Sequence, residues 1–279
     1  MRPTRLLAIL LLCAAAAPSV GQAAPTSGRA TPVGDVAAAA ARLGVDPQTI
    51  DDLVTANRIL AHEGILDAYG HVSMRHPTRP DHYLIARSLA PEFVTAADIV
   101  DYDLDSNPAS PGAEHGYIER FIHGEIYKAR PDVRAIVHSH SAALIPFSVS
   151  NVPLRPVFHM AAFIADGVPV WDSAASNAPD STGILVRNPA LGASLARALG
   201  NRSAVLMRGH GAVVATPTIE SAVRNSIFLD ANARMQVAAI KLGGPIHYVS
   251  WPEALALAKG NGDPRRAWDY WKRRALGAR

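Results

Sequence analysis

RPDVRAIVHSH, residues 130–140, is the segment from which we predict both the architecture and the chemistry of this chain. Pro131 ends a preceding helix, because proline lacks the backbone donor that a helix needs. The apolar run 135–137 is typical of a short buried strand, and it leads directly into two histidines that flank a serine. Side chains two residues apart on a strand point to the same face, so we expect His138 and His140 to project together from the strand end.

Short apolar runs and longer periodic segments alternate on both sides of this stretch. They predict strands at Tyr83–Ala86, Ile99–Leu104 and Ala204–Met207, and helices from Asp46-Pro47 to Gly64, from Tyr117 to Ala129, and from Thr216-Pro217 to Lys241. Strands interleaved with helices predict an α/β sandwich in which helices cover a sheet. Periodicity alone does not set the order of the strands.

The two ends of the chain differ in composition from its middle. Residues 1–24 combine a basic start, an apolar run and a small-residue cleavage site, which is typical of a signal peptide and predicts a periplasmic or secreted protein. Residues 25–45 are rich in Ala, Gly, Pro and Thr, so we expect a flexible segment. We assign one domain to residues 46–255 and an amphipathic tail to residues 256–279.

Two tryptophans, Trp268 and Trp271, are one helical turn apart in this tail, beside a cluster of arginines and lysines. We expect the tail to pack against the domain or a neighbouring subunit, because large aromatic side chains favour burial. Binding to a membrane surface or an acidic partner is the alternative.

The composition excludes several classes of function. The chain has 27 basic and 24 acidic residues, and loss of Arg2 and Arg5 with a signal peptide would leave 25 basic residues. This balance predicts no binding of nucleic acid. No segment after the N-terminal run approaches the roughly 20 apolar residues of a membrane span. Cys13 is the only cysteine and lies in the predicted signal peptide, so the mature chain would have no thiol. We therefore expect chemistry from histidines, carboxylates and hydroxyls on a small-molecule substrate.

A third histidine turns the pair at residues 138 and 140 into a candidate metal site. By itself the pair could equally be solvated or packed in the core. His210 follows a second predicted strand, and Gly209 and Gly211 on either side allow a close approach of the backbone to a ligand. Three histidines that leave one position open are typical of a catalytic zinc site.

Glu119 is the candidate acid or base. It lies on the predicted helix before residues 130–140, one turn from His123 and on the same face. A glutamate on a surface helix is the simpler interpretation. The position just before the two histidines favours a role at the site.

Three stretches together resemble the signature segments of the class II aldolase/adducin family. They are Gly70-His71-Val72-Ser73-Met74-Arg75, the segment 130–140, and Arg208-Gly209-His210-Gly211, and the resemblance covers roughly residues 46–250. It implies that His138, His140 and His210 bind a divalent metal, with zinc favoured over manganese, iron or cobalt, and that Glu119 is the acid/base. It also implies a three-layer α/β/α sandwich around a largely antiparallel sheet, commonly a homotetramer with active sites between subunits.

The departures from that family bear on the substrate. Sugar-phosphate aldolases have an asparagine where this chain has His71, and paired serines where it has Tyr117-Ile118. We therefore do not expect a phosphorylated substrate, because a phosphate dianion needs several donors to replace its water. The family's catalytic tyrosine corresponds to His159, which could transfer a proton or could be a packed histidine.

The segments around His71 and Ser73 and around Arg87 and Ser88 are more similar to the branch of hydroxy-acid and hydroxylated aromatic acid decarboxylases. We expect these four residues to bind substrate, with Arg87 pairing with a carboxylate. The resemblance thus implies a carbon–carbon lyase that passes through a metal-stabilised enolate-type intermediate. Decarboxylation and aldol cleavage of an unphosphorylated carbonyl substrate both remain open. A non-catalytic adducin-like scaffold is the alternative from another class, which the three histidines and Glu119 argue against.

Overall fold

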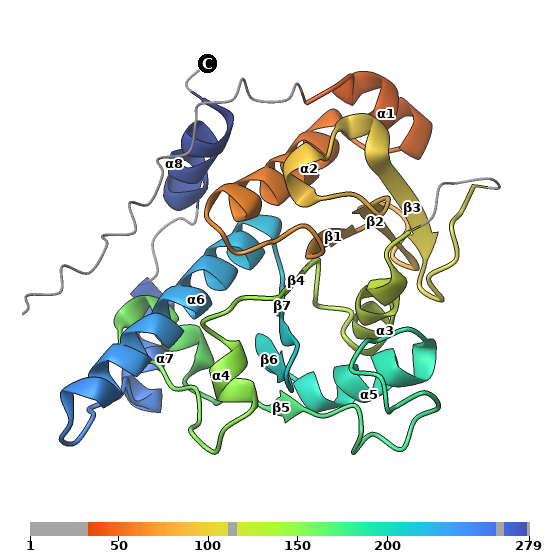
Figure 1. The fold of residues 1–279 in the computed structure, drawn as a ribbon. Coiled ribbons are helices and arrows are strands. Elements are labelled where there is room, and N and C mark those ends of the chain that lie inside the picture. Colours follow the sequence, from red (N-terminus) through yellow and green to blue (C-terminus); the bar gives the residue numbers. More distant parts are fainter. Residues whose placement is uncertain (1–32, 111–115, 261–264, 278–279) are drawn as a thin grey trace, which may run out of the picture.

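The computed structural model describes residues 33–110, 116–260 and 265–277. Its centre is a seven-stranded sheet with the order β3-β2-β1-β4-β7-β6-β5 (Figure 1). The strands are β1 (His71–Arg75), β2 (His82–Ala86), β3 (Ile99–Asp103), β4 (Ala135–Ser139), β5 (Val170–Trp171), β6 (Ala204–Met207) and β7 (Gly211–Thr216). Only the short β5 pairs in parallel, with β6, and the other neighbours are antiparallel. The prediction of a largely antiparallel α/β sheet is therefore confirmed.

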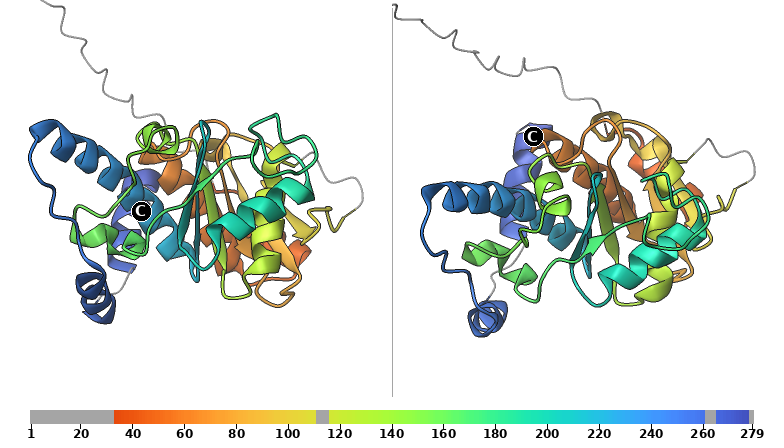
Figure 2. Two further views of the ribbon diagram at one scale, coloured as in Figure 1. Left: turned by 90° about the horizontal axis from the view of Figure 1, so that it is seen from below. Right: turned by 60° about the horizontal axis from the view of Figure 1, so that its bottom comes forward.

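Helices cover both faces of this sheet, as two views from other directions show (Figure 2). On one face α2 (Pro47–His62) contacts β1, and α6 (Ile219–Leu242) contacts β4 and β7. On the other face α3 (Phe121–Ala129) packs against α5 (Pro189–Leu199). Helices α3 and α5 lie so close together that a Cβ atom at Gly192 would be 2.5 Å from the carbonyl oxygen of Phe121. The three-layer α/β/α architecture is confirmed.

Strand β4 is central and buried along its whole length, as expected for the run that precedes His140. His138 on β4 lies opposite His71 on β1, so the two side chains share one face of the sheet. Strands β6 and β7 form a hairpin whose turn contains Gly209, at a φ of +65° that favours glycine. A Cβ atom at Gly211 would be only 2.0 Å from the carbonyl oxygen of Ser139, so this hairpin lies directly against the end of β4.

The N-terminal segment differs from the prediction. Helix α1 (Val36–Leu43) lies within residues 25–45, begins at the N-cap Asp35, and buries Ala39, Ala40 and Leu43. The expectation of a flexible segment is therefore wrong for residues 36–43. The alanine-rich composition that suggested low complexity also has the highest helix propensity, and contact with α2 stabilises it. Residues 1–32, with the predicted signal peptide, lie outside the described residues.

The C-terminal tail is helical and packs on the domain. Helix α7 (Trp251–Gly260) is followed by α8 (Arg265–Leu276), which contacts α2 and α6. Trp268 and Trp271 are both buried, and Lys272 forms an ion pair with Asp51 of α2 at 2.7 Å. The packing of the two tryptophans against the domain is thus confirmed.

Short helical segments complete the described fold. They are η1 (Pro91–Phe93), η2 (Ala96–Asp98), η3 (Ile118–Arg120), α4 (Ile145–Ser148) and η4 (His159–Ile164). Within the described ranges no helix combines the length and the apolar character needed to cross a membrane.

Candidate metal centre and its surroundings

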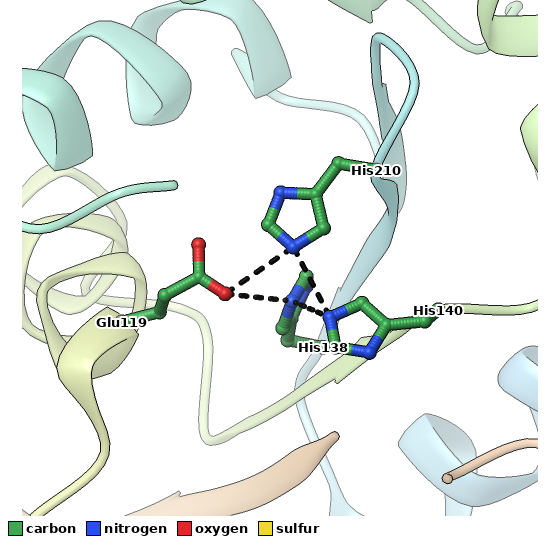
Figure 3. Close-up of side chains that lie close together, drawn as sticks. All are labelled: Glu119, His138, His140 and His210. Atoms are coloured by element: carbon green, nitrogen blue, oxygen red, sulfur yellow. Dashed lines mark hydrogen bonds and ion pairs between the residues drawn. The ribbon is translucent and has the colours of Figure 1, made fainter. Parts of the chain in front are cut away.

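Four side chains converge where β4 ends beside the β6–β7 hairpin (Figure 3). The Nε2 atom of His140 lies 3.2 Å from that of His138 and 3.1 Å from that of His210. Glu119, at the start of the helical segment before β4, places Oε2 3.4 Å from His138 Nε2 and 3.2 Å from His210 Nε2. The residues proposed from the sequence as metal ligands and acid/base thus form one cluster.

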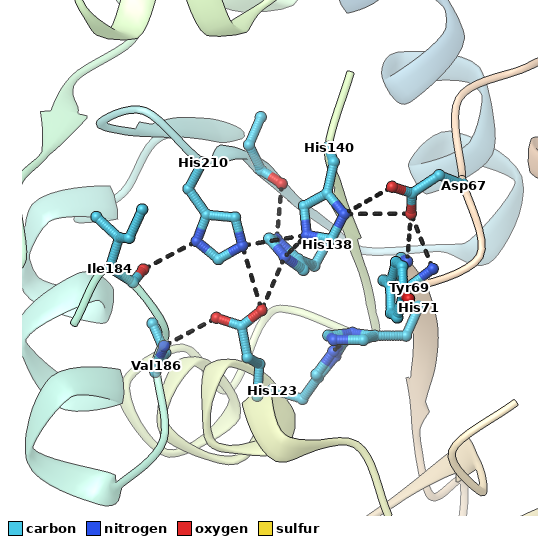
Figure 4. Close-up of polar contacts among 12 residues, drawn as sticks. Asp67, Tyr69, His71, His123, His138, His140, Ile184, Val186 and His210 are labelled. Carbon is cyan, nitrogen blue, oxygen red and sulfur yellow. Dashed lines mark hydrogen bonds and ion pairs between the residues drawn. The ribbon is translucent and has the colours of Figure 1, made fainter. Parts of the chain in front are cut away.

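Each histidine of the cluster is held by its other ring nitrogen (Figure 4). The Nδ1–H group of His138 donates to the carbonyl of Ala212 at 3.2 Å, and that of His210 donates to the carbonyl of Ile184 at 2.9 Å. His140 Nδ1 lies 3.0 Å from Oδ2 of Asp67. Since carbonyl and carboxylate oxygens only accept, Nδ1 must carry the proton, and all three Nε2 lone pairs face the centre.

Glu119 is buried, and one of its oxygens is held by the fold. Oε1 accepts a hydrogen bond from the backbone N–H of Val186 at 2.8 Å, which leaves Oε2 toward the histidines. Burial raises the pKa of Glu119, but the contacts with His138 and His210 outweigh burial and hold that pKa well below its usual range. The group is therefore a carboxylate at neutral pH.

These four atoms fit a divalent cation. With Nδ1 protonated, three neutral Nε2 lone pairs and a carboxylate oxygen would repel one another unless a positive charge lies between them. A proton on His210, whose pKa is raised by Glu119 against the lowering effect of burial, supplies that charge only in part. Tetrahedral coordination with the usual zinc–nitrogen bond length puts ligand atoms about 3.3 Å apart. Four of the six separations, at 3.1 to 3.4 Å, agree with this value, and all four atoms lie within 4.8 Å of one another.

A second group of polar side chains lies behind the cluster and is completely buried. His71 Nδ1 is 2.7 Å from His123 Nε2, and His123 Nδ1 is 2.6 Å from Ser73 Oγ. The His71 ring has its centroid 5.0 Å from that of His138 and 4.6 Å from that of Tyr117. His71, predicted to bind substrate, therefore adjoins the cluster, whereas Ser73 is enclosed by protein groups.

Arg87 and Ser88 follow β2 at its end. Arg87 is partly buried and donates from Nε to Oδ1 of Asp98 at 2.7 Å, while Ser88 is exposed. Leu89 follows Ser88, and its carbonyl accepts a hydrogen bond from the hydroxyl of Tyr117 at 2.6 Å. This bond places the loop with Arg87 and Ser88 on the His71 side of the cluster. Their contact with a substrate stays a prediction.

The structure does not bring His159 to the cluster within this chain. His159 opens η4, is exposed, and has its ring edge-to-face with Phe158 at 6.1 Å between centroids. Helix η4 packs on α6 and α7, away from the strand ends that carry the cluster. A role for His159 in proton transfer therefore stays a prediction.

Sequence reasoning missed Asp67, which holds His140. Its Oδ1 also accepts from the backbone N–H groups of Tyr69 and Gly70, each at 2.9 Å, so it shapes the turn that leads into β1. An aspartate three residues before the glycine of the first signature stretch was the available signal. Its partner His140 is 73 residues away, and this pairing does not follow from spacing.

Comparison with known proteins agrees with this geometry. Residues 51–237 match the family described as Class II Aldolase and Adducin N-terminal domain. Decarboxylase tropJ of Talaromyces stipitatus is 37% identical over 220 residues, covering 75% of this chain and 79% of that protein. The 3,4-dihydroxyphthalate decarboxylase of Arthrobacter keyseri is 34% identical over 211 residues, covering 70% and 79%.

A solved structure supports the same assignment. L-fuculose 1-phosphate aldolase from Glaciozyma antarctica PI12 superimposes with a TM-score of 0.65 at 26% identity, covering 82% of this chain and 87% of that one. The chain belongs to the class II aldolase and adducin family. Its decarboxylase relatives support a lyase, and the site has the His and Glu donors that a divalent metal requires.

Proposed function

We propose that this protein is a divalent-metal-dependent decarboxylase of an unphosphorylated hydroxylated carboxylic acid, with an aromatic acid of the dihydroxyphthalate type as the favoured substrate. The observation that carries the proposal is the cluster of three histidine Nε2 atoms and the Glu119 carboxylate, with every Nδ1 held from outside. Zinc is the favoured ion because the donors are mainly nitrogen and their spacing fits tetrahedral coordination. Manganese, iron and cobalt are the alternatives.

The surroundings of the cluster suit a flat aromatic acid better than a sugar phosphate. Where sugar-phosphate aldolases have paired serines, Tyr117 uses its hydroxyl on the carbonyl of Leu89 and Ile118 is exposed. Neither side chain offers a free donor for a phosphate. The rings of Tyr117 and His71 instead pack together beside His138, so the surroundings of the cluster are aromatic.

Decarboxylation breaks the bond between a carbon atom and its carboxylate and leaves the electron pair on that carbon. Carbon dioxide departs, and the carbon forms a new C–H bond with one proton. A divalent metal held by His138, His140 and His210 would supply a Lewis acid for neighbouring substrate oxygens. Glu119 Oε2, at the edge of the cluster, can take the proton of the substrate hydroxyl and return it to the carbon. Arg87 and Ser88 would bind the carboxylate or hydroxyl groups at the other side.

The direct test uses the protein with zinc added and after treatment with a chelator, each incubated with 3,4-dihydroxyphthalate. We expect release of carbon dioxide that depends on metal, and no turnover of L-fuculose 1-phosphate as the matched control. Cleavage of L-fuculose 1-phosphate to two carbonyl products instead would favour the aldolase. A protein that binds no divalent ion and releases no carbon dioxide would favour the adducin-like scaffold.

We also propose a homo-oligomer, with a tetramer as the expected form. Large apolar side chains are exposed along the end of α6 and on α7, among them Leu242 at 87% and Trp251 at 51%. Leu255 and Ile240 on the same two helices are also exposed. Large apolar side chains left exposed in such numbers on two helices favour an interface. Light scattering after size-exclusion chromatography should give a multiple of the chain mass, and replacement of Trp251 and Leu255 by serine should lower it. A monomer in the unchanged protein would contradict the proposal.

Export is the final part of the proposed function. Its support is the signal-like composition of residues 1–24. Mass spectrometry of the protein produced in a Gram-negative host should find a chain that begins near Ala24 or Pro25 in the periplasm. An intact Met1 would contradict it.

A further inference from the structure

A continuous chain of hydrogen bonds leads away from His71 into the protein interior. His71 Nδ1 contacts His123 Nε2 at 2.7 Å, His123 Nδ1 contacts Ser73 Oγ at 2.6 Å, and Ser73 Oγ contacts the hydroxyl of Tyr127 at 2.9 Å. None of the four side chains is more than 1% exposed. The proposed decarboxylation assigns no role to Ser73, His123 or Tyr127.

The number of protons in the chain determines the direction of its hydrogen bonds. Burial lowers the pKa of His123 to about 3, helped by the nearby His138, so this ring is neutral and carries a single N–H. His71 is equally buried, and its hydrogen-bonded partner among the described residues is the neutral ring of His123, so it too carries a single N–H. Each neutral ring then has one donor and one acceptor nitrogen. All hydrogen bonds of the series therefore point the same way, with every donor directed either toward His71 or away from it.

With a substrate oxygen beside His71 Nε2, only one direction uses every donor. If the chain runs toward His71, Tyr127 donates to Ser73, Ser73 donates to His123 Nδ1, and His123 donates from Nε2 to His71 Nδ1. In the opposite direction the last hydroxyl proton, on Tyr127, would have no acceptor among the contacts of the described residues. A buried donor without a partner costs about 1–3 kcal/mol, which is enough to select the first direction.

We propose that Ser73 and His123 are positioning residues that hold His71 as the Nε2–H tautomer, and that this N–H donates a hydrogen bond to a negatively charged oxygen of the substrate. Tyr127 completes the chain by donating to Ser73. The proposal rests on the proposed function, because the substrate oxygen is that of a hydroxylated carboxylic acid. The proposal further specifies that Nε2 of His71 donates to the substrate, and that His123 and Ser73 keep the proton on this atom.

The position of His71 makes this donor useful. His71 lies opposite His138 in the register of β1 and β4, so its ring stands beside the metal cluster. Its Nδ1 is occupied by His123, which leaves Nε2 as the only ring nitrogen that can act on a substrate. A donor that the protein holds in place before the substrate arrives stabilises negative charge on oxygen at no cost of reorganisation.

Nuclear magnetic resonance can read the tautomers directly. In the zinc-loaded protein with ¹⁵N-labelled histidine, long-range ¹H–¹⁵N spectra distinguish Nδ1–H from Nε2–H rings. We expect His71 and His123 both to be Nε2–H. If either ring is Nδ1–H, the proposed direction is wrong, whatever reaction the protein catalyses.

Substitutions at Ser73 and Tyr127 separate positioning from simple packing. Ser73→Ala removes the hydroxyl that donates to His123, so the Nε2–H preference of both rings should weaken and kcat/KM should fall roughly tenfold. Ser73→Thr retains a hydroxyl on the strand and should restore both. Tyr127→Phe leaves the Ser73 donor in place, so the tautomers should persist. Equal effects of all three changes on tautomer and activity would overturn the positioning role.

The contact with the substrate is tested with 3,4-dihydroxyphthalate added to the zinc-loaded Glu119→Gln variant, in which turnover is slowed. The Nε2–H proton resonance of His71 should move downfield when the compound is added. An unchanged resonance would overturn the substrate contact. Nε2–H tautomers in a protein that releases no carbon dioxide from any hydroxylated acid would instead disprove the proposed function and leave the hydrogen-bond chain standing.

Discussion

Asp67, in the turn before β1, holds His140 just after the end of β4, with its two carboxylate oxygens 3.1 and 3.0 Å from the ring Nδ1. The contact orients the imidazole so that Nε2 faces His138 and His210. It also gives the ring a negatively charged partner, which makes Nε2 a better ligand. The pKa of Asp67 is lowered, since hydrogen bonds from Tyr69 and His140 outweigh the effect of burial, so the partner is ionised at neutral pH.

We predict that Asp67→Asn lowers metal affinity without unfolding the protein. The asparagine oxygen can still accept the backbone bonds of the turn, but the ionised partner of His140 is lost. Loss of such a partner typically lowers metal affinity about 10–100-fold. Competition with a chromogenic chelator measures the affinity. Asp172→Asn, which removes the exposed ion pair with Arg208, is the matched control and should leave it unchanged. Equal affinities in the two variants would contradict the role of Asp67.

A second prediction concerns His210 itself. His210→Ala removes one of three histidine ligands, so bound zinc and activity should be lost together, because the remaining ligands bind poorly. Metal content is measured by inductively coupled plasma mass spectrometry after dialysis. His247, an exposed histidine, serves as the control, and His247→Ala should retain full occupancy. Full occupancy in His210→Ala would disprove the metal site.

The sequence alone predicted much of this arrangement. The apolar run before His138 predicted a strand. Because side chains alternate between the two faces of a strand, we correctly expected His138 and His140 to lie together. The convergence of His210 and Glu119 came from the resemblance to the family, since nothing in their spacing sets the distance between a hairpin turn and a helix start. The α/β sandwich followed from the alternation of strands and helices, and the three-layer arrangement around a largely antiparallel sheet followed from the resemblance.

The elements and residues that the sequence did not predict were missed for one physical reason. Strand β7 begins at Gly211 and is buried along its length, so it has no polar alternation to mark it. Helix α5 begins with Asn188 as N-cap and Pro189, a signal that was present, but its burial depends on contact with α3. Asp67 and Tyr127 act through partners on other elements. Such roles depend on the packing of distant segments, which sequence periodicity does not encode.

The buried histidines predict how stability depends on pH. The pKa values of His71 and His123 are lower in the folded protein than in the unfolded chain, since burial disfavours the charged rings. The unfolded chain therefore binds more protons below its histidine pKa of about 6.5, and the free energy of unfolding decreases as the pH falls from there. Each such histidine contributes a slope of about 1.4 kcal/mol per pH unit between its two pKa values.

Urea unfolding of the zinc-saturated protein between pH 6.5 and pH 4.5 measures this slope. His71→Asn removes one of the two groups, so its slope should be smaller than that of the unchanged protein by roughly one proton. Contributions from the metal ligands are common to both proteins and cancel in the comparison. Identical slopes would mean that His71 is protonated in the folded state, contrary to its burial.

The last prediction is that Glu119→Gln abolishes proton transfer while it preserves the fold. Glutamine has nearly the same shape, and its Oε1 can still accept the hydrogen bond that Val186 N–H gives to Glu119. The three histidines remain to bind the metal, so zinc content should be close to that of the unchanged protein. Turnover should nevertheless fall about a hundredfold or more, the usual effect of losing a general acid or base.

Glu125→Gln is the matched control for this change. Glu125 lies on α3, a short way along the chain from Glu119, and pairs with Lys128 rather than with the cluster. This variant should turn over 3,4-dihydroxyphthalate at a normal rate. If Glu119→Gln were equally active, the carboxylate could not be the group that moves the proton. The proton would then have to come from elsewhere, and because His159 is exposed on η4 and lies apart from the cluster within one chain, it could act only at a site completed by a second subunit.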